Sequence, residues 1–194
     1  MIILASNSPR RKELLGGLDL EFRTWVIPDI DESYPVTLPA DETAEYLATK
    51  KSEPYFTAPH IEALNDDDVV LTADTVVILD GEVLGKPADA EDARNMLRKL
   101  SGKTHYVITG VCLRTKQRSH HFSVKTDVTF ANLTDEQIDY YVDKYKPLDK
   151  AGAYGIQEWI GYVGVTNLNG SYFNVMGLPV QRIYAELNYF LYNK

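Results

Sequence analysis

The chain has 194 residues, of which 44% are hydrophobic and 25% charged, and its formal net charge is −8. This is the composition of a folded globular protein, so it excludes a disordered chain. The acidic balance argues against a general nucleic-acid binder, which needs a basic surface. The single cysteine, Cys112, excludes an intrachain disulfide and a cysteine-based zinc cluster.

Targeting and membrane signals are also missing from the sequence. No apolar run approaches the ~20 residues that a membrane-spanning helix needs. The first residues carry no charge ahead of their short apolar run and soon reach Arg10, Arg11 and Lys12, so no signal peptide is expected. These features predict a cytoplasmic protein with no membrane and no nucleic acid among its partners.

The N-terminal half alternates between the patterns of strands and helices. In chain order it predicts a strand at 1–5, a helix at 9–15, a strand at 22–27, an acidic proline-rich loop at 28–39, a helix capped by Asp41 and ending near Lys51, a strand at 69–79 and a hairpin strand at 82–84. The apolar residues at 44, 47 and 48 face inward in the second helix.

The C-terminal half continues the alternation. In chain order it predicts a helix at 89–100, strands at 104–114 and 118–130, a helix at 134–145 that begins with a capping box of Thr134 and Gln137, an irregular segment at 147–170 with a strand at 162–166, and a helix from Pro179 through Leu187. This order of elements indicates an α/β fold. We expect one compact domain, with a division into two lobes near residue 100.

Residues 6–11, Ser-Asn-Ser-Pro-Arg-Arg, stand between the first strand and the first helix. The N–H groups at a helix start attract anions, and guanidinium groups bind oxyanions through paired hydrogen bonds. The segment therefore predicts a phosphate or carboxylate site that includes Ser6, Ser8, Arg10 and Arg11. An ordinary capped helix with solvated arginines explains the same residues and is commoner on pattern alone.

Asp74 lies within the apolar strand at 69–79. A carboxylate is costly to bury there unless it is paired or bound to a metal. Asp74 is therefore predicted to be a metal ligand or a general base, with a structural turn cap as the alternative.

Two loops add further candidates. Lys86 stands between Gly85 and Pro87, where a compact ammonium group could meet a phosphate, although a solvated lysine is the simpler explanation. Residues 149–157 combine small residues with an aromatic ring and an amide, which suits a nucleoside pocket. Its candidates are Lys150, Tyr154 and Gln157, and a packed glycine-rich turn is the alternative.

Six collinear motifs together resemble the Maf family of nucleoside triphosphate pyrophosphatases, first named for inhibition of septum formation. They lie at residues 5–15, 73–77, 85–87, 100–105, 149–154 and 174–179. The resemblance covers nearly the whole chain. It implies a single domain over residues 1–194 with the elongated α/β fold of inosine triphosphate pyrophosphatases: a central twisted mixed sheet, flanking helices and two lobes around a cleft.

The resemblance also implies an activity and its site. A homodimer would hydrolyse a nucleoside triphosphate to the monophosphate and pyrophosphate with a divalent cation, Mg²⁺ or Mn²⁺. Asp74 matches the catalytic acid, and Glu32 matches an acid that shares the metal with it. The phosphate-handling positions match Ser6, Arg11, Lys51 and Lys86, of which both lysines are expected to act in catalysis. Because the chain is acidic overall, a local cluster of cations must attract the triphosphate. We expect one cleft to gather Arg10, Arg11, Lys12, Lys51, Lys86 and Lys150.

Arg10, Thr75 and Gln157 match positions that separate the branches of this family. Their combination resembles the branch acting on dTTP and UTP, and implies removal of modified pyrimidine nucleotides as well. The alternatives are a 7-methyl-GTP pyrophosphatase and a non-catalytic nucleotide-binding regulator of septum formation. One departure stands out: small residues usually follow the glutamine in this branch, whereas Glu158 and Trp159 follow it here.

Overall fold

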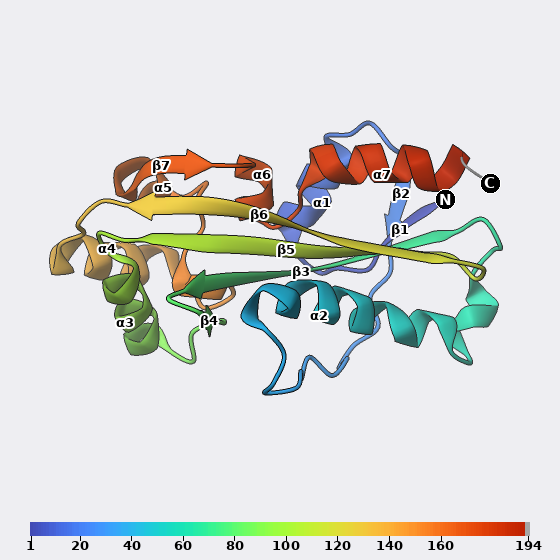
Figure 1. Cartoon of the computed structure of the whole chain (residues 1–194), viewed down its shortest axis with the longest axis horizontal. Helices are drawn as coiled ribbons and strands as arrows, with labels where there is room; N and C mark the ends of the chain where they lie inside the picture. Colours follow the sequence, from blue (N-terminus) through green and yellow to red (C-terminus); the bar gives the residue numbers. More distant parts are fainter. Residues whose placement is uncertain (193–194) are drawn as a thin grey trace. The chain divides into compact units, whose positions relative to one another are not determined.

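The computed structural model describes residues 1–192, with side chains through residue 190, and contains a seven-stranded mixed sheet with flanking helices (Figure 1). The strands are β1 (Ile2–Leu4), β2 (Phe22–Thr24), β3 (Val69–Leu79), β4 (Glu82–Leu84), β5 (Thr104–Arg114), β6 (Ser119–Phe130) and β7 (Val165–Asn169). The α-helices are α1 (Pro9–Gly16), α2 (Thr43–Ser52), α3 (Ala90–Leu100), α4 (Asp135–Tyr145), α5 (Trp159–Gly164), α6 (Tyr172–Met176) and α7 (Val180–Tyr192). Short 3₁₀ turns occupy Ala40–Glu42, Glu53–Phe56, His60–Ala63 and Ala151–Ala153.

The sheet confirms the predicted α/β class. Its order is β2-β1-β3-β5-β6-β7, with β4 paired to β3 beside this path. Strand β1 runs parallel to β2 and β3, whereas β4 and β7 run antiparallel to their neighbours. The place of β1 between two parallel neighbours agrees with its short apolar run, which is typical of a buried parallel strand.

The chain forms two compact units, and the predicted division near residue 100 is wrong. The first unit comprises Met1–Asp74, Thr109–Val124 and the chain from Gly177 onward, and the second comprises Thr75–Ile108 and Lys125–Met176. Strands β3, β5 and β6 each contribute residues to both units, so no single point in the sequence separates them.

In the first unit, helix α2 lies along the first half of β3 (Figure 1), where the Thr72 hydroxyl donates to the Ala48 carbonyl at 2.6 Å. The expected inward residues of α2 are buried. The predicted cap at Asp41 is wrong, because a 3₁₀ turn leads directly into the helix and Glu42 precedes it without a side-chain cap. The Ala40 carbonyl of that turn accepts the Thr43 N–H at the start of the helix instead.

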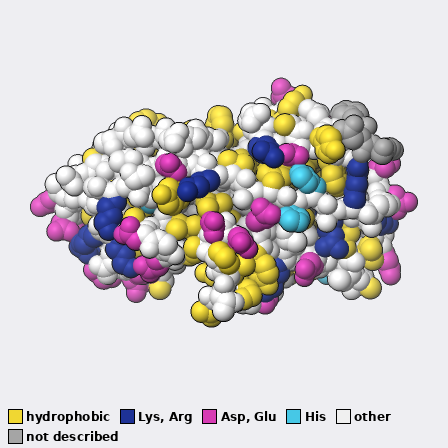
Figure 2. Space-filling view, viewed as in Figure 1, with side chains coloured by type: hydrophobic (Ala, Val, Ile, Leu, Met, Phe, Trp, Pro, Cys, Tyr) yellow, Lys and Arg dark blue, Asp and Glu magenta, His cyan; other side chains and the backbone are white. Residues whose placement is uncertain are grey.

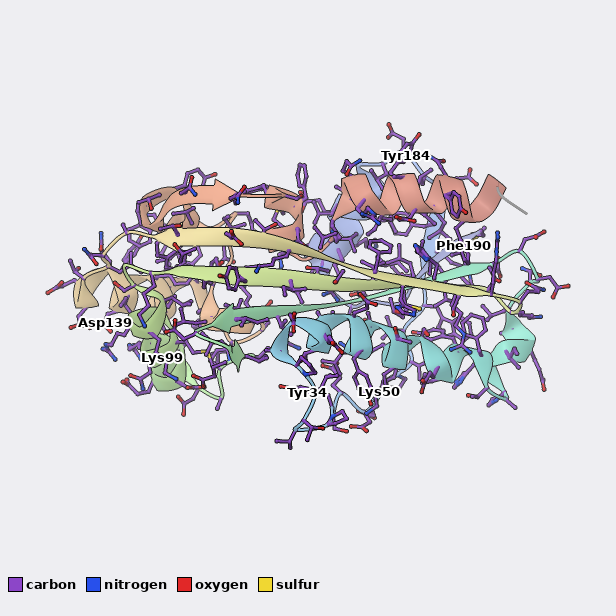
Figure 3. All side chains as sticks on the ribbon, viewed as in Figure 1. Tyr34, Lys50, Lys99, Asp139, Tyr184 and Phe190 are labelled. Carbon is purple, nitrogen blue, oxygen red and sulfur yellow. The ribbon has the colours of Figure 1, made fainter. Side chains whose placement is uncertain are left out.

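In the second unit, helices α3 and α4 pack together (Figure 1) and are joined by ion pairs. The Arg94 guanidinium contacts Asp139 at 2.8 Å and Asp143 at 2.5 Å. Figure 3 labels Asp139 on α4 and Lys99 on α3. The capping box of α4 is present as predicted, with Thr134 and Gln137 bonded reciprocally.

The strand expected at 162–166 is wrong in its position. Helix α5 continues through Gly164, and β7 begins at Val165. Gly161 explains the helical start, because a Cβ there would lie 1.7 Å from the Ile156 carbonyl oxygen, an approach that only glycine permits. β7 then pairs with β6 across an irregularity at Thr129 and Phe130.

Charges are mixed on the molecular face that Figure 2 shows, where acidic and basic side chains alternate without a broad basic patch. Within residues 1–192, no helix is both long enough and apolar enough to cross a bilayer.

Gly110 provides a test of how closely the first unit is packed. A Cβ at this position would lie 2.3 Å from the backbone of Ala44 at the start of α2. Gly110→Ala should therefore lower the free energy of unfolding by roughly 1–3 kcal/mol or more, because backbone cannot yield as a flexible side chain does. Urea denaturation measures the change.

Gly16→Ala is the matched control in the same unit, because its Cβ would meet only Phe22 at 4.0 Å. We expect it to change stability by less than about 0.5 kcal/mol. Equal stability of the two variants would contradict the close approach of β5 to α2.

Candidate active site

Asp74 is the buried acid at the centre of the candidate site in the first unit. Its neighbours along β3 are almost all buried, and only 12% of its own side chain is exposed. The Lys51 ammonium of α2 lies 2.6 Å from Asp74 Oδ1 and is itself largely buried. The cost of placing a carboxylate in an apolar strand is thus met by direct pairing with a cation.

Glu32 reaches the same ammonium group from the acidic loop. Its Oε1 lies 3.1 Å from Lys51 Nζ, while about half of its side chain remains exposed. The structure therefore brings Glu32, Lys51 and Asp74 together, with one cation between two carboxylates.

The preceding lysine fastens the same loop. Lys50 Nζ lies 2.7 Å from Asp31 Oδ2 and donates to the Ser33 carbonyl at 2.6 Å. The hydrogen bond from Lys50, with bonds from Ser33, lowers the pKa of Asp31 to about 2. Figure 3 labels Lys50 on α2 and Tyr34 on the loop. Lys50 thus binds the acidic loop, whereas Lys51 contacts both Glu32 of that loop and Asp74.

Arg11 is partly buried and supports the strand that carries Asp74. Its Nη1 donates to the Ala73 carbonyl at 2.7 Å, and its Nε donates to the Gly177 carbonyl at 2.8 Å. Burial lowers the pKa of Arg11, and the nearby charge of Asp74 opposes that effect. The guanidinium thus fixes the peptide beside Asp74, and its predicted contact with phosphate stays a prediction.

The start of α1 has the features of an anion site. Ser8 caps the helix by accepting from the Arg11 N–H at 3.4 Å, and the Ser8 N–H donates to Ser6 Oγ at 3.2 Å. A hollow of about 490 Å³ opens here. Its lining comprises Ser6, Asn7, Ser8, Pro9, Lys12, Thr24 and Val26. Arg10 lies in the first turn and is partly exposed. Ser6, Ser8 and Lys12 thus line one hollow at a helix start, which favours anions.

The second unit holds the remaining candidates. Thr75 directly follows Asp74 on β3 and is partly exposed, and Lys86 is exposed on the loop after β4. The Gly152 N–H donates to the Gly85 carbonyl at 3.0 Å, which links the Lys86 loop to the glycine-rich segment.

Lys150 and Gln157 come together around Gly155. Lys150 Nζ lies 2.7 Å from Asp149 Oδ1 and 3.2 Å from Glu158 Oε1. Gln157 Oε1 is shielded from solvent and has no hydrogen-bond partner among the side chains and backbone that the structure describes.

Tyr154 lies in the core of the second unit. Its ring is almost fully buried and packs edge-on against Phe130, and its hydroxyl lies 2.7 Å from His105 Nε2. Burial lowers the pKa of His105 to about 4, so this histidine is neutral near pH 7. The predicted contact of Tyr154 with the nucleoside stays a prediction, and what the structure shows is a packing role.

Sequence reasoning missed the roles of Glu158 and Tyr141. The Tyr141 hydroxyl donates to Glu158 Oε2 and accepts from the Gly155 N–H at 3.0 Å. One sequence signal pointed to Glu158: it stands where the branch usually has a small residue after Gln157. No sequence signal distinguishes Tyr141 from the apolar residues of its helix.

The acids of the first unit fit a cation that arrives with its own ligands. Among residues 1–190, no group of three or more His, Cys, Asp or Glu side chains could hold a metal ion. Asp74 and Glu32 nevertheless converge on one positive charge. Mg²⁺ in phosphate-handling sites commonly takes one or two carboxylates, with phosphate and water oxygens completing its shell. This donor set therefore fits such an ion.

Comparison with known proteins finds relatives that match this chain over nearly its full length. The dTTP/UTP pyrophosphatase of Phocaeicola vulgatus is 59% identical over 186 residues, covering 96% of this chain and 94% of the relative. The protein of the same name from Parabacteroides distasonis is 55% identical over 189 residues, covering 97% and 95%. That from Flavobacterium psychrophilum is 49% identical, covering 96% and 92%.

A solved HAM1 protein from Coxiella burnetii shares the fold, with a TM-score of 0.52 at 16% identity, covering 96% of this chain and 98% of that one. This agrees with the expected fold of inosine triphosphate pyrophosphatases. The family described as Maf-like protein matches residues 1–190. The resemblance of the motifs is therefore confirmed, and the chain belongs to the Maf family.

Proposed function

We propose that this protein hydrolyses dTTP and UTP to the nucleoside monophosphate and pyrophosphate. Relatives that share more than half of its residues over nearly its full length carry the name dTTP/UTP pyrophosphatase. The structural observation that carries the proposal is the pair of Asp74 and Lys51 at 2.6 Å. It supplies an acid in an apolar strand beside a cation, as hydrolysis of a phosphoanhydride requires.

Asp74 orients the attacking water and takes its proton at Oδ2, the carboxylate oxygen opposite the one that Lys51 holds. The water oxygen bonds to the α-phosphorus, and the bond from that phosphorus to the α,β-bridging oxygen breaks. Pyrophosphate leaves with the electron pair. Lys51 keeps the carboxylate in place and offsets negative charge on the substrate.

The other phosphate contacts follow from the resemblance and from the hollow at α1. Ser6 and Ser8 offer hydroxyl and backbone donors there, and Lys12 adds a positive charge. Lys86 would offset charge on the leaving pyrophosphate, as the family resemblance implies.

A divalent cation, Mg²⁺ or Mn²⁺, belongs to the same proposal. Asp74 and Glu32 would hold it, together with oxygens of the triphosphate. When bound, such an ion supplies charge neutralisation on the phosphates.

Gln157 is proposed to read the base. Its amide offers both an acceptor and a donor, which match the N3–H and O4 edge of uracil or thymine. Modified pyrimidine nucleotides with the same edge would be substrates too.

The homodimer that the resemblance implies is also part of the proposal. Light scattering measures the mass of the protein in solution and so tests it.

Asp74→Asn should abolish most of the activity. Loss of a general base typically lowers the rate by roughly 10²- to 10⁴-fold, and the asparagine cannot take the proton from water. Pyrophosphate release from UTP with Mg²⁺ measures the effect. Asp66→Asn removes an exposed acid of the same unit, which pairs with Lys116, and should leave the rate unchanged. Near-normal turnover by Asp74→Asn would remove Asp74 from the mechanism.

A panel of triphosphates separates the alternatives. UTP and dTTP should be cleaved with a kcat/KM at least about tenfold above that of 7-methyl-GTP, since one well-placed base contact is worth about that factor. Liquid chromatography of the monophosphate products measures this. Faster cleavage of 7-methyl-GTP would move the protein to the other branch, and binding without turnover of any nucleotide would favour the non-catalytic regulator.

A further inference from the structure

Glu158 stands directly after the residue proposed to read the base, yet its own side chain is committed to the protein. It precedes helix α5 without capping it. One carboxylate oxygen contacts the Lys150 ammonium at 3.2 Å, and the other accepts from the Tyr141 hydroxyl. Both oxygens therefore have a donor, and the negative charge is balanced locally by Lys150.

Glu158, Lys150 and the Gln157 amide crowd one point above Gly155. A Cβ on Gly155 would lie 3.0 Å from Gln157 Nε2, 3.1 Å from Glu158 Cδ and 3.1 Å from Lys150 Cε. The NH₂ end of the amide thus lies beside both members of the Glu158 and Lys150 ion pair. A side chain at this position would require these groups to shift by a few tenths of an ångström.

The other end of the amide is the unsatisfied one. Gln157 Oε1 is shielded from water and finds no donor among the described residues. The donors around this turn are already engaged: Lys150 by Asp149 and Glu158, Tyr141 by Glu158, and the Gly155 N–H by Tyr141. An unpaired buried acceptor costs free energy, which a donor on a ligand would recover without first displacing water.

Electrostatics explains why the amide keeps this orientation. A carboxylate attracts the NH₂ end of an amide and repels its oxygen, whereas an ammonium group does the opposite. Asp149 and Glu158 both contact Lys150, so two carboxylates and one ammonium leave a net negative charge beside Nε2. Without Glu158 that net charge is lost, and the amide is no longer held with Nε2 toward the cluster.

We infer that Glu158 is a positioning residue for base selectivity: it holds the Gln157 amide so that Oε1 is reserved for a substrate that donates from N3. Uracil and thymine carry a hydrogen at N3, whereas cytosine carries a lone pair there. The inference rests on the proposed function and names the residue that lets this site discriminate against cytosine nucleotides.

Glu158→Gln tests the inference, because it keeps the size and the acceptor for Tyr141 but removes the charge. We expect the ratio of kcat/KM for UTP to that for CTP to fall at least tenfold. The loss should come from a higher KM for UTP, with kcat within about threefold of the parent. Calorimetric titration with UMP and CMP should show the same fall in the ratio of affinities.

Tyr145→Phe is the matched control. Its ring stacks on Tyr141, with centroids 5.1 Å apart, so it lies beside the network. It should keep the parent ratio. Should Glu158→Gln fail to fold, Tyr141→Phe removes one of the two donors to Glu158 and should lower the ratio about threefold.

An unchanged ratio in folded Glu158→Gln would overturn the inference while leaving the proposed function intact. An equal loss in Tyr145→Phe would also overturn it, since the effect would then be general to the helix. If the parent protein released no pyrophosphate from UTP, the proposed function itself would fail.

Discussion

The pairing of one ammonium group with one buried carboxylate is the constraint on which the site depends. Asp74 lies in a strand whose other residues are almost all buried. The free-energy cost of burying a carboxylate there without a counter-charge would be prohibitive. Lys51 offsets that cost at 2.6 Å and holds the acid in place. Arg11 adds a second restraint by binding the peptide on the N-terminal side of Asp74. Lys51 thus holds the Asp74 side chain, and Arg11 holds the peptide that precedes it.

The sharing of Lys51 between two carboxylates affects how further charges can bind at this site. Lys51 contacts both Glu32 and Asp74, so the two acids are held near one positive charge before any substrate binds. Under the proposed function, a triphosphate and its cation would bring further charges of both signs to these acids. The described side chains form no metal cage of their own, so the proposed cation needs further ligands from the substrate.

Much of this was predictable from the sequence, because local patterns govern it. The strand containing Asp74 was predicted with its observed bounds, since its apolar run is long and ends at a turn of Asp80 and Gly81, both with positive φ. The capping box of α4 was predicted for the same reason. The importance of Asp74 followed from a single acid in an apolar run, although only the structure identifies Lys51 as its partner, because helix α2 and β3 meet through tertiary packing.

Other features depend on contacts that no local pattern encodes. The strand at 162–166 was misplaced because Gly161 permits a backbone approach to Ile156 that the sequence does not reveal. Two lobes were expected, but the boundaries of the two units escaped prediction because long strands pass through both. Glu158 looked like a departure from the family, and only its bonds to Lys150 and Tyr141 show that its charge is balanced.

The most direct test of the central claim is a double-mutant cycle on Lys51 and Asp74, with unfolding free energy and pyrophosphate release measured for each variant. Lys51→Met should lose about 3 kcal/mol of stability, because it leaves a buried carboxylate unpaired. Adding Asp74→Asn should restore most of that stability while the protein remains inactive. Additive losses of stability, or activity in the double variant, would contradict the account.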